Sequence, residues 1–290
     1  MASRAIPFDQ IFDAEFLDSV RHLRFVARRV DRRGRFAEQR SRDLGDGIEF
    51  RDFRPYTPGD DFRAIDWNIY RRLGRVFLRL FEQLEDLPLY LLPDVSESAF
   101  LESETEPTAR ARAGLRACLA LAAISLAQHD SVGLLPFADD LRVVQRPQAG
   151  KGTLVRFARR LAALEPGGRT DLARSLARLD ALRLRTGVVA IVSDFFDPAG
   201  IDAVTTALRR VRHRLVLVQL ARASDRDPRL TGDLRLRDCE SGAAADVSVT
   251  SDVLARYRAA YDRFDHGLLE FARRHGAGLV RLDCDAPVVP

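Results

Sequence analysis

The chain has 290 residues, of which 46% are hydrophobic and 30% charged, and its formal net charge is only +4. This balance predicts a soluble globular protein and argues against a basic, nucleic-acid-binding domain. Three widely spaced cysteines exclude a disulfide framework and a zinc site, and no apolar run reaches the length of a membrane span. Because no signal-peptide core follows the N-terminus, the cytoplasm is the expected compartment.

A helix is predicted from Phe8 to about Arg33, because apolar residues recur there at steps of three and four. Residues 21–42 carry nine arginines against two acidic residues. This charge is either an ordinary solvated helix face or a binding surface for an acidic partner or an anionic surface. The arginines proposed for partner binding are Arg28, Arg29, Arg32 and Arg33. Nucleic acid is a weak candidate, since we expect no exposed aromatic residues to interleave with the arginines of this stretch.

Residues 45–82 alternate arginines and carboxylates with aromatic residues, which is too polar for a core and too aromatic for a linker. We expect a partly buried network of ion pairs and hydrogen bonds, with Trp67 as its apolar anchor. Its other members are expected to be Glu49, Asp52, Arg54, Tyr56, Asp60, Asp61, Arg63 and Asp66. Residues 76–81 read as a strand.

From residue 87 onward, strand and helix patterns alternate, which predicts an α/β fold with a doubly wound, mostly parallel sheet. The predicted strands cover residues 87–92, 131–137, 141–145, 187–193, 215–220 and 278–282. The predicted helices cover residues 107–128, 152–164, 171–184, 200–212 and 251–275. We therefore expect an N-terminal region, 1–85, made of a helix and a polar β region. A main domain, 86–290, follows, with a β-hairpin inserted at about 221–250.

Oxygen-bearing side chains follow the first buried strand of this domain at alternate positions. Asp94, Ser96 and Ser98 come directly after an apolar run, where ligands bind in open α/β sheets. One carboxylate and two hydroxyls are hard ligands that suit Mg²⁺ or Mn²⁺. The alternative is that these residues only cap a helix, since Asp and Ser are ordinary N-cap residues.

Two later segments are expected at the same edge of the sheet. Thr170 lies in a Gly-Gly-x-Thr loop before a helix, and Asp194 ends a second apolar strand. If the two strands are neighbours where the strand order reverses, five oxygens surround one point. Octahedral Mg²⁺ takes six ligands, so one position stays open for water or an incoming carboxylate.

These motifs resemble the metal-ion-dependent adhesion site (MIDAS) of von Willebrand factor A domains. The segment from Gly47 to Trp67 further resembles a bacterial family of unknown function, domain-of-unknown-function family fifty-eight. All positions of its pattern Gly-x-Glu-Phe-x-Asp-x-Arg-x-Tyr-x-x-Gly-Asp-Asp-x-Arg-x-Ile-Asp-Trp are present. The pattern Leu236-x-Asp238-x-Glu240-x-Gly242 also looks like this family. The chain departs from the family in Pro93 before the site aspartate and in Ala99 after Ser98.

The resemblance implies a von Willebrand factor A-like, Rossmann-type domain. It also implies a partner, a MoxR-type AAA+ ATPase or its client, with a role in chaperone-like maturation or metal insertion. We accordingly expect a metal-dependent binding module and not an enzyme. One alternative is an Mg²⁺-dependent phosphoesterase, although Asp94-x-Ser96 lacks the second acid of aspartyl-phosphate enzymes. The other alternative is nucleic-acid or anionic-surface binding by residues 21–42.

Overall fold

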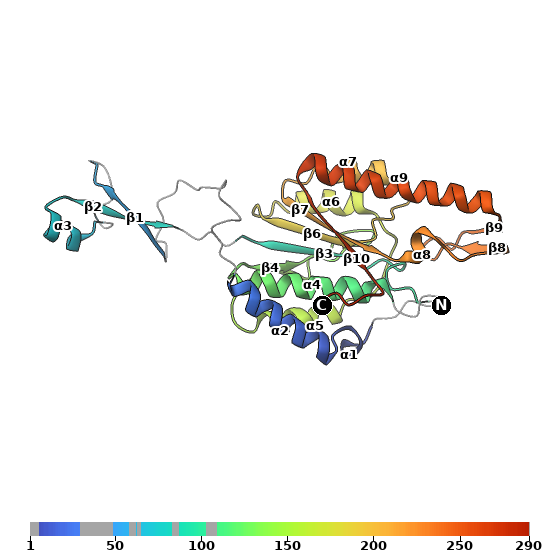
Figure 1. The fold of residues 1–290 in the computed structure, drawn as a ribbon, viewed down its shortest axis with the longest axis horizontal. Helices are drawn as coiled ribbons and strands as arrows, with labels where there is room; N and C mark the ends of the chain where they lie inside the picture. The colour runs from blue at the N-terminus through green and yellow to red at the C-terminus, as the bar shows by residue number, and fades with distance from the viewer. Residues whose placement is uncertain are drawn as a thin grey trace. The chain divides into compact units, whose positions relative to one another are not determined.

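The computed structural model describes residues 6–29, 49–57, 62, 65–82, 87–102 and 109–289. The chain forms two compact units (Figure 1). The larger unit combines Met1–Val30 with Leu87–Pro290, and the smaller unit is Asp31–Asp86. The two units are described separately below.

A six-stranded sheet forms the centre of the larger unit, with the strand order β10-β7-β6-β3-β4-β5. All pairs are parallel except β4 with β5, so the predicted α/β class with a mostly parallel sheet is confirmed. The strands are β3 (Leu89–Pro93), β4 (Val132–Leu134), β5 (Gln145–Gln148), β6 (Val188–Ser193), β7 (Arg214–Ala221) and β10 (Gly278–Asp283). The strand predicted at 141–145 lies later, at β5, because residues 138–144 are used in the turn that reverses the chain.

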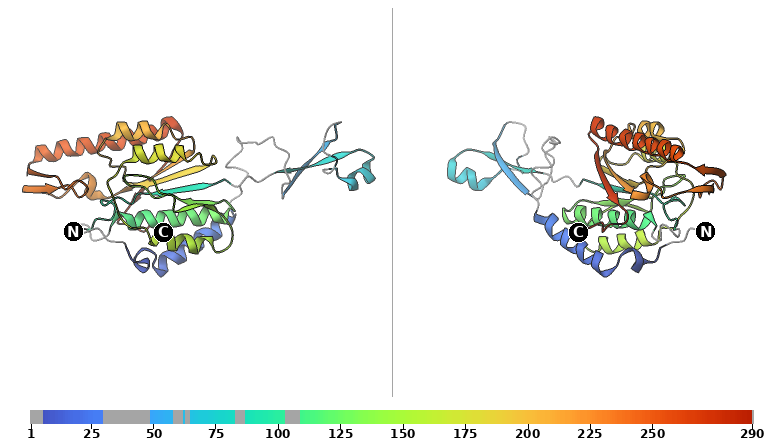
Figure 2. Two further views of the ribbon diagram at one scale, coloured as in Figure 1. Left: turned by 180° about the vertical axis from the view of Figure 1, so that it is seen from behind. Right: turned by 45° about the vertical axis from the view of Figure 1, so that its right-hand side comes forward.

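Helices cover both faces of this sheet (Figures 1 and 2). One face carries α4 with α1, α2 and α5, and the other carries α6, α7 and α9. The bounds are α1 (Phe8–Ile11), α2 (Ala14–Arg29), α4 (Arg110–Ala127), α5 (Thr153–Ala162), α6 (Leu172–Ala181), α7 (Ile201–Leu208), α8 (Ala223–Arg226) and α9 (Ser251–His275). None of the helices in the described residues combines the length and the hydrophobicity that a membrane crossing needs.

Strand β3 is buried on both faces, and alternate side chains enter different cores. Leu89 and Leu91 pack in the layer that contains α4, whereas Tyr90 and Leu92 pack in the layer that contains α6 and α7. This alternation follows from the two-residue period of a strand and explains its continuous apolar run. Charged side chains are therefore excluded from the body of β3 and begin only at its carboxyl end, at Asp94; the one polar group within it, the Tyr90 hydroxyl, donates to the carbonyl of Arg185 at 2.8 Å.

The N-terminal helix belongs to the larger unit and packs on α4. The predicted stripe is buried at Phe12, Phe16, Val20 and Ala27. The predicted single helix is divided at Asp13, whose carboxylate accepts a hydrogen bond from the N–H of Phe16 and pairs with Arg116 of α4. The structure thus differs from the expected 1–85 region, which grouped this helix with the following β region, because its apolar stripe needs a partner face and α4 supplies one.

The smaller unit contains the antiparallel strands β1 (Glu49–Pro55) and β2 (Phe77–Glu82), with α3 (Trp67–Leu73) between them. Asp66 caps α3 and accepts hydrogen bonds from the N–H groups of Asn68 and Ile69. Trp67, expected as a buried anchor, is instead 57% exposed, because it is the first residue of α3 and contacts only the edge of Tyr70 among the described rings. Tyr56 is also exposed.

The remaining members of the predicted network lie outside the part of the chain that the structure describes at side-chain level. These are the side chains of Glu49, Asp52 and Arg54 and the residues Asp60, Asp61 and Arg63. The same holds for the predicted partner-binding side chains of Arg28 and Arg29 and for the residues Arg32 and Arg33.

The predicted β-hairpin is present as the antiparallel strands β8 (Gly232–Arg237) and β9 (Ala244–Val249). Asp238 stabilises its turn, residues 238–243, because its carboxylate accepts hydrogen bonds from the N–H groups of Glu240 and Ser241. These bonds lower the pKa of Asp238, because they favour its charged form. The tip of the hairpin therefore keeps its shape through its own contacts.

Substitution of Phe16 tests whether α2 is part of the larger unit. Phe16 is 5% exposed and lies beneath the guanidinium group of Arg116, 5.1 Å from the ring centre. We expect Phe16→Ala to lower the free energy of unfolding by about 3–5 kcal/mol, measured by urea denaturation. Phe25→Ala, on the 53% exposed ring of the same helix, is the control and should cost about 1 kcal/mol or less. Equal losses would contradict the docking of α2.

Candidate functional site

The candidate site lies where β3 and β6 end side by side. The two strands pair in parallel, and the N–H of Asp94 donates to the carbonyl of Val192 at 2.9 Å. Within the sheet, β4, the next strand in the chain, lies beside one edge of β3, and β6, which comes later, lies beside the other edge. The strand order thus reverses at this edge, as predicted, and such a reversal opens a crevice at the strand ends.

Backbone hydrogen bonds hold the loop of Thr170 against the loop of Asp94. The N–H of Gly167 donates to the carbonyl of Val95 at 3.0 Å, and the N–H of Glu97 donates to the carbonyl of Gly168 at 3.2 Å. Gly168 has φ of +82°, and a Cβ there would lie 2.9 Å from Asp139 Oδ1. Gly168 therefore suits this position, because its positive φ and the closeness of the Asp139 side chain leave little room for a Cβ, whereas Gly167 has open space around it.

The carboxylate of Asp94 is buried and held by two donors. Its Oδ1 accepts from the N–H of Ser96 at 2.9 Å, and its Oδ2 accepts from the hydroxyl of Ser193 at 2.7 Å. Ser193 was not identified from the sequence, because a serine at the end of an apolar strand gives no separate signal. These two bonds fix the orientation of the carboxylate before any ligand arrives.

Three of the predicted hydroxyls converge with a carboxylate that was not assigned to the site. The hydroxyl oxygens of Ser96 and Ser98 are 3.0 Å apart. Ser98 donates to Glu240 Oε1 at 2.7 Å, and Thr170 donates to the same oxygen at 2.9 Å. The N–H of Thr170 donates to Glu240 Oε2 at 3.1 Å. Ser98 and Thr170, which are distant in sequence, therefore meet at one oxygen atom.

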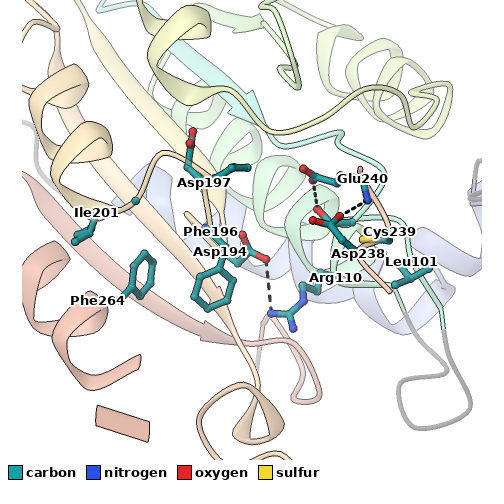
Figure 3. Close-up of a pocket in the computed structure, with 13 residues that line it drawn as sticks. Leu101, Arg110, Asp194, Phe196, Asp197, Ile201, Asp238, Cys239, Glu240 and Phe264 are labelled. Atoms are coloured by element: carbon teal, nitrogen blue, oxygen red, sulfur yellow. Dashed lines mark hydrogen bonds and ion pairs between the residues drawn. The ribbon is translucent and has the colours of Figure 1, made fainter. Parts of the chain in front are cut away.

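Asp194 lies at the end of the neighbouring strand and faces Arg110 (Figure 3). Its Oδ2 is 3.8 Å from the guanidinium of Arg110, which pairs more closely with Asp225. Its Oδ1 accepts from the N–H of Phe196 at 3.0 Å. Phe195, between them, is buried with φ of +63°, a strained conformation for a residue with a side chain. Arg110 is the first residue of α4, and no pattern in the sequence assigned it to the site.

Burial and nearby negative charge destabilise the charged forms of both aspartates. The pKa of Asp94 is raised, chiefly by burial, and the hydrogen bonds from Ser193 and Ser96 oppose that rise. Burial raises the pKa of Asp194 to about 7, with a further contribution from the charge of Asp94, while Arg110 opposes it. Glu240 adds negative charge near Asp94. The site thus concentrates negative charge that the nearby arginine compensates only in part.

A pocket of about 450 Å³ opens beside these groups. Its lining is partly polar, with Ser98, Arg110, Asp194 and Glu240, and partly apolar, with Leu101, Phe196, Pro198, Ile201 and Phe264. In Figure 3, Phe196, Ile201 and Phe264 lie on one side and Glu240 and Leu101 on the other. Phe196 and Phe264 are in contact, with ring centres 4.8 Å apart. The hairpin tip, residues 238–240, forms another wall.

The donor set fits a hard divalent cation. Two carboxylates and three hydroxyls are oxygen ligands of the kind that Mg²⁺ and Mn²⁺ prefer. Among the described residues no three His, Cys, Asp or Glu side chains form a metal-binding group, so a cation here would depend on the hydroxyls. A cation would also offset the repulsion from Asp94 that helps to raise the pKa of Asp194.

The structure brings most of the predicted ligands together. Asp94, Ser96, Ser98 and Thr170 are joined through the hydrogen bonds described above, and Asp194 is coupled to Asp94 through their charges. Glu240 was visible in the sequence only as part of the family-like pattern at 236–242. No periodicity could place it here, because it lies 142 positions from Ser98.

The sequence profile of a family described as "Protein of unknown function DUF58" matches residues 52–266. The chain belongs to this family. The match confirms the family that the pattern from Gly47 to Trp67 predicts. Uncharacterized proteins of Mycobacterium tuberculosis and Mycobacterium bovis are 26% identical to this DUF58 protein over 224 residues, which are 75% of its length and 69% of theirs.

Two solved structures show distant similarity to this DUF58 protein. BatB from Bacteroides thetaiotaomicron has a TM-score of 0.41 at 13% identity, covering 68% of this chain and 90% of that one. An aerotolerance-related membrane protein from Bacteroides fragilis has the same score and identity, covering 68% and 92%. The family assignment rests on the profile match.

The raised pKa of Asp194 predicts a pH-dependent stability in EDTA. Because the folded pKa, about 7, exceeds the usual value of 3.8, this group contributes stability below pH 4 that is lost as pH rises through 7. Asp194→Asn removes the titration. We expect its melting temperature to exceed that of the wild type by a few degrees at pH 8 but by less at pH 5, since about 1 kcal/mol corresponds to roughly 2–4 °C. A constant difference across this range would contradict the assignment.

Proposed function

We propose that this DUF58 protein is a metal-dependent, protein-binding adaptor with a von Willebrand factor A-like domain. In this proposal it acts with a MoxR-type AAA+ ATPase in the chaperone-like maturation or assembly of client proteins. The observation that carries the proposal is the convergence of Ser98 and Thr170 on one oxygen of a carboxylate, beside Asp94. An adhesion site must gather these hydroxyls and receive a carboxylate at the same place.

The predicted ligands have separate roles in this proposal. Ser96, Ser98 and Thr170 supply neutral oxygens, and Asp94 and Asp194 supply the charge. A bound Mg²⁺ or Mn²⁺ would supply positive charge and a coordination position for a carboxylate of the partner. Since three of the five ligands are neutral, the cation would keep a strong attraction for an additional anionic ligand. Ser193 and the N–H of Ser96 hold the Asp94 carboxylate in its orientation.

The groups beside the site favour binding over catalysis. The pocket contains one thiol, Cys239, whose pKa is raised by burial and by the charges of Glu240 and Asp238. A raised pKa keeps the thiol protonated at neutral pH and makes it a poor nucleophile. No histidine is among the residues that line the pocket. A phosphoesterase would need a base or a nucleophile next to the cation.

The partner's identity in this proposal comes from the family resemblance, and its chemistry comes from the site. A carboxylate of the ATPase or of its client would bind at the cation. The arginine-rich segment that includes Arg28, Arg29, Arg32 and Arg33 would offer a second contact to an acidic surface. The experiment below separates the two contacts, because only the first depends on metal.

A pull-down with a MoxR-type ATPase from the same genome tests the proposal. We expect the wild type to retain the ATPase in millimolar Mg²⁺ and to lose it in EDTA. Asp94→Ala and Thr170→Val should each reduce retention in Mg²⁺ by at least about tenfold, the equivalent of about 1.4 kcal/mol. Asp94→Asn, which keeps the shape of the side chain, separates lost charge from lost packing.

Glu97→Gln is the matched control, because Glu97 is an exposed acid in the same loop as Ser96 and Ser98. It should bind like the wild type, and circular dichroism should show that every variant is folded. Equal retention in Mg²⁺ and in EDTA would refute the metal-dependent contact. Retention that falls steeply with salt but ignores EDTA would assign binding to the arginines instead.

A further inference from the structure

We propose that Glu240 is an internal ligand of this site and occupies the position that a partner's carboxylate would take. The inference rests on the proposed function, because it gives Glu240 a role at the same cation. Binding of the partner would then require the β8–β9 hairpin to leave the site. The protein would hold its own acidic residue on the adhesion site until a competing carboxylate replaces it.

The first argument is the geometry of the Glu240 carboxylate. Both of its oxygens are engaged, and the donors are Ser98 and Thr170, two of the predicted metal ligands. The carboxylate therefore lies against the face of the site on which an external acid would have to bind. A partner's carboxylate could not reach both hydroxyls while Glu240 is hydrogen-bonded to them.

The second argument is charge. Among the described residues no arginine or lysine pairs with Glu240, and its contacts are the three hydrogen bonds from Ser98 and Thr170. Its charge instead acts against the buried carboxylate of Asp94. An anion placed beside another anion is unfavourable unless a cation lies between them. A cation held by Asp94 and Asp194 would convert this repulsion into attraction and would attach the hairpin tip to the site.

The third argument is that the hairpin can leave at low cost. No residue of β8 or β9 is buried, so moving the two strands exposes little apolar surface. The tip keeps its shape through Asp238, which bonds the N–H groups of Glu240 and Ser241, and the N–H of Gly242 donates to the carbonyl of Asp238 at 2.9 Å. The tip can therefore move as a unit, and the bonds of Glu240 to Ser98 and Thr170 attach it to the site loops.

Hydrogen–deuterium exchange of the whole chain, with Mg²⁺ as the only added ligand, tests this inference. In the wild type we expect Mg²⁺ to slow amide exchange in residues 238–243 by about tenfold relative to EDTA, because the metal fixes Glu240. Glu240→Gln keeps an acceptor for Ser98 and Thr170 but removes the charge. It should lose the Mg²⁺-dependent protection of the tip while the loop of Asp94 stays protected.

Asp246→Asn is the matched control, since it removes one acid from the same hairpin. The Asp246 side chain is 86% exposed and lies 3.9 Å from Arg235, away from the predicted ligands. It should show the wild-type protection. Glu240→Ala, in which no acceptor remains, is the second variant and should show the same exchange of the tip in Mg²⁺ and in EDTA, without added protection in either buffer.

Calorimetric titration with Mg²⁺ separates failure of the inference from failure of the proposed function. If the wild type binds Mg²⁺ and Asp94→Ala does not, but Glu240→Gln keeps full protection of the tip, the internal ligand is refuted and the metal site stands. If the wild type does not bind Mg²⁺, the proposed function and the internal ligand both fail. Mg²⁺ affinity about tenfold weaker in Glu240→Gln, with loss of tip protection, supports the inference.

Discussion

The parallel pairing of β3 with β6 is the contact on which the site depends. Both strands are largely buried, so their side chains alternate between two apolar cores and leave no place for a charged group until each strand ends. The two ends lie next to each other, and Asp94 and Asp194 follow directly. The same packing that stabilises the sheet thus concentrates two acids at one edge, where water has little access.

This concentration of charge works against stability, and that cost indicates a function. Burial and repulsion raise the pKa values of both aspartates, and Phe195 adds a strained backbone directly after Asp194. Structures keep such unfavourable features where binding or chemistry needs them. Arg110 offsets the charge only partly, because Asp225 competes for the same guanidinium group.

The local patterns of the sequence predicted the mostly parallel sheet and most helices, since strand and helix periods are properties of neighbouring residues. They also picked out four side chains that hydrogen bonds connect at the candidate site. The features that these patterns could not predict depend on contacts between residues far apart in the sequence. Arg110 and Glu240 reach the site only through tertiary packing, and α2 joins the larger unit because α4 offers it an apolar face. Trp67 was misjudged for a different reason: its size suggested an anchor, but as the first residue of α3 it points to solvent.

One detail of the hairpin tip makes its position observable. Of the three cysteines in the chain, Cys118 and Cys284 are buried and only Cys239 is exposed. Burial raises the pKa of all three thiols, but a maleimide reagent at mildly alkaline pH still reaches only an accessible sulfur. A single fluorophore attached there, without any engineered cysteine, would sit one residue from Glu240. The natural sequence therefore already contains a label site on the segment whose movement matters most.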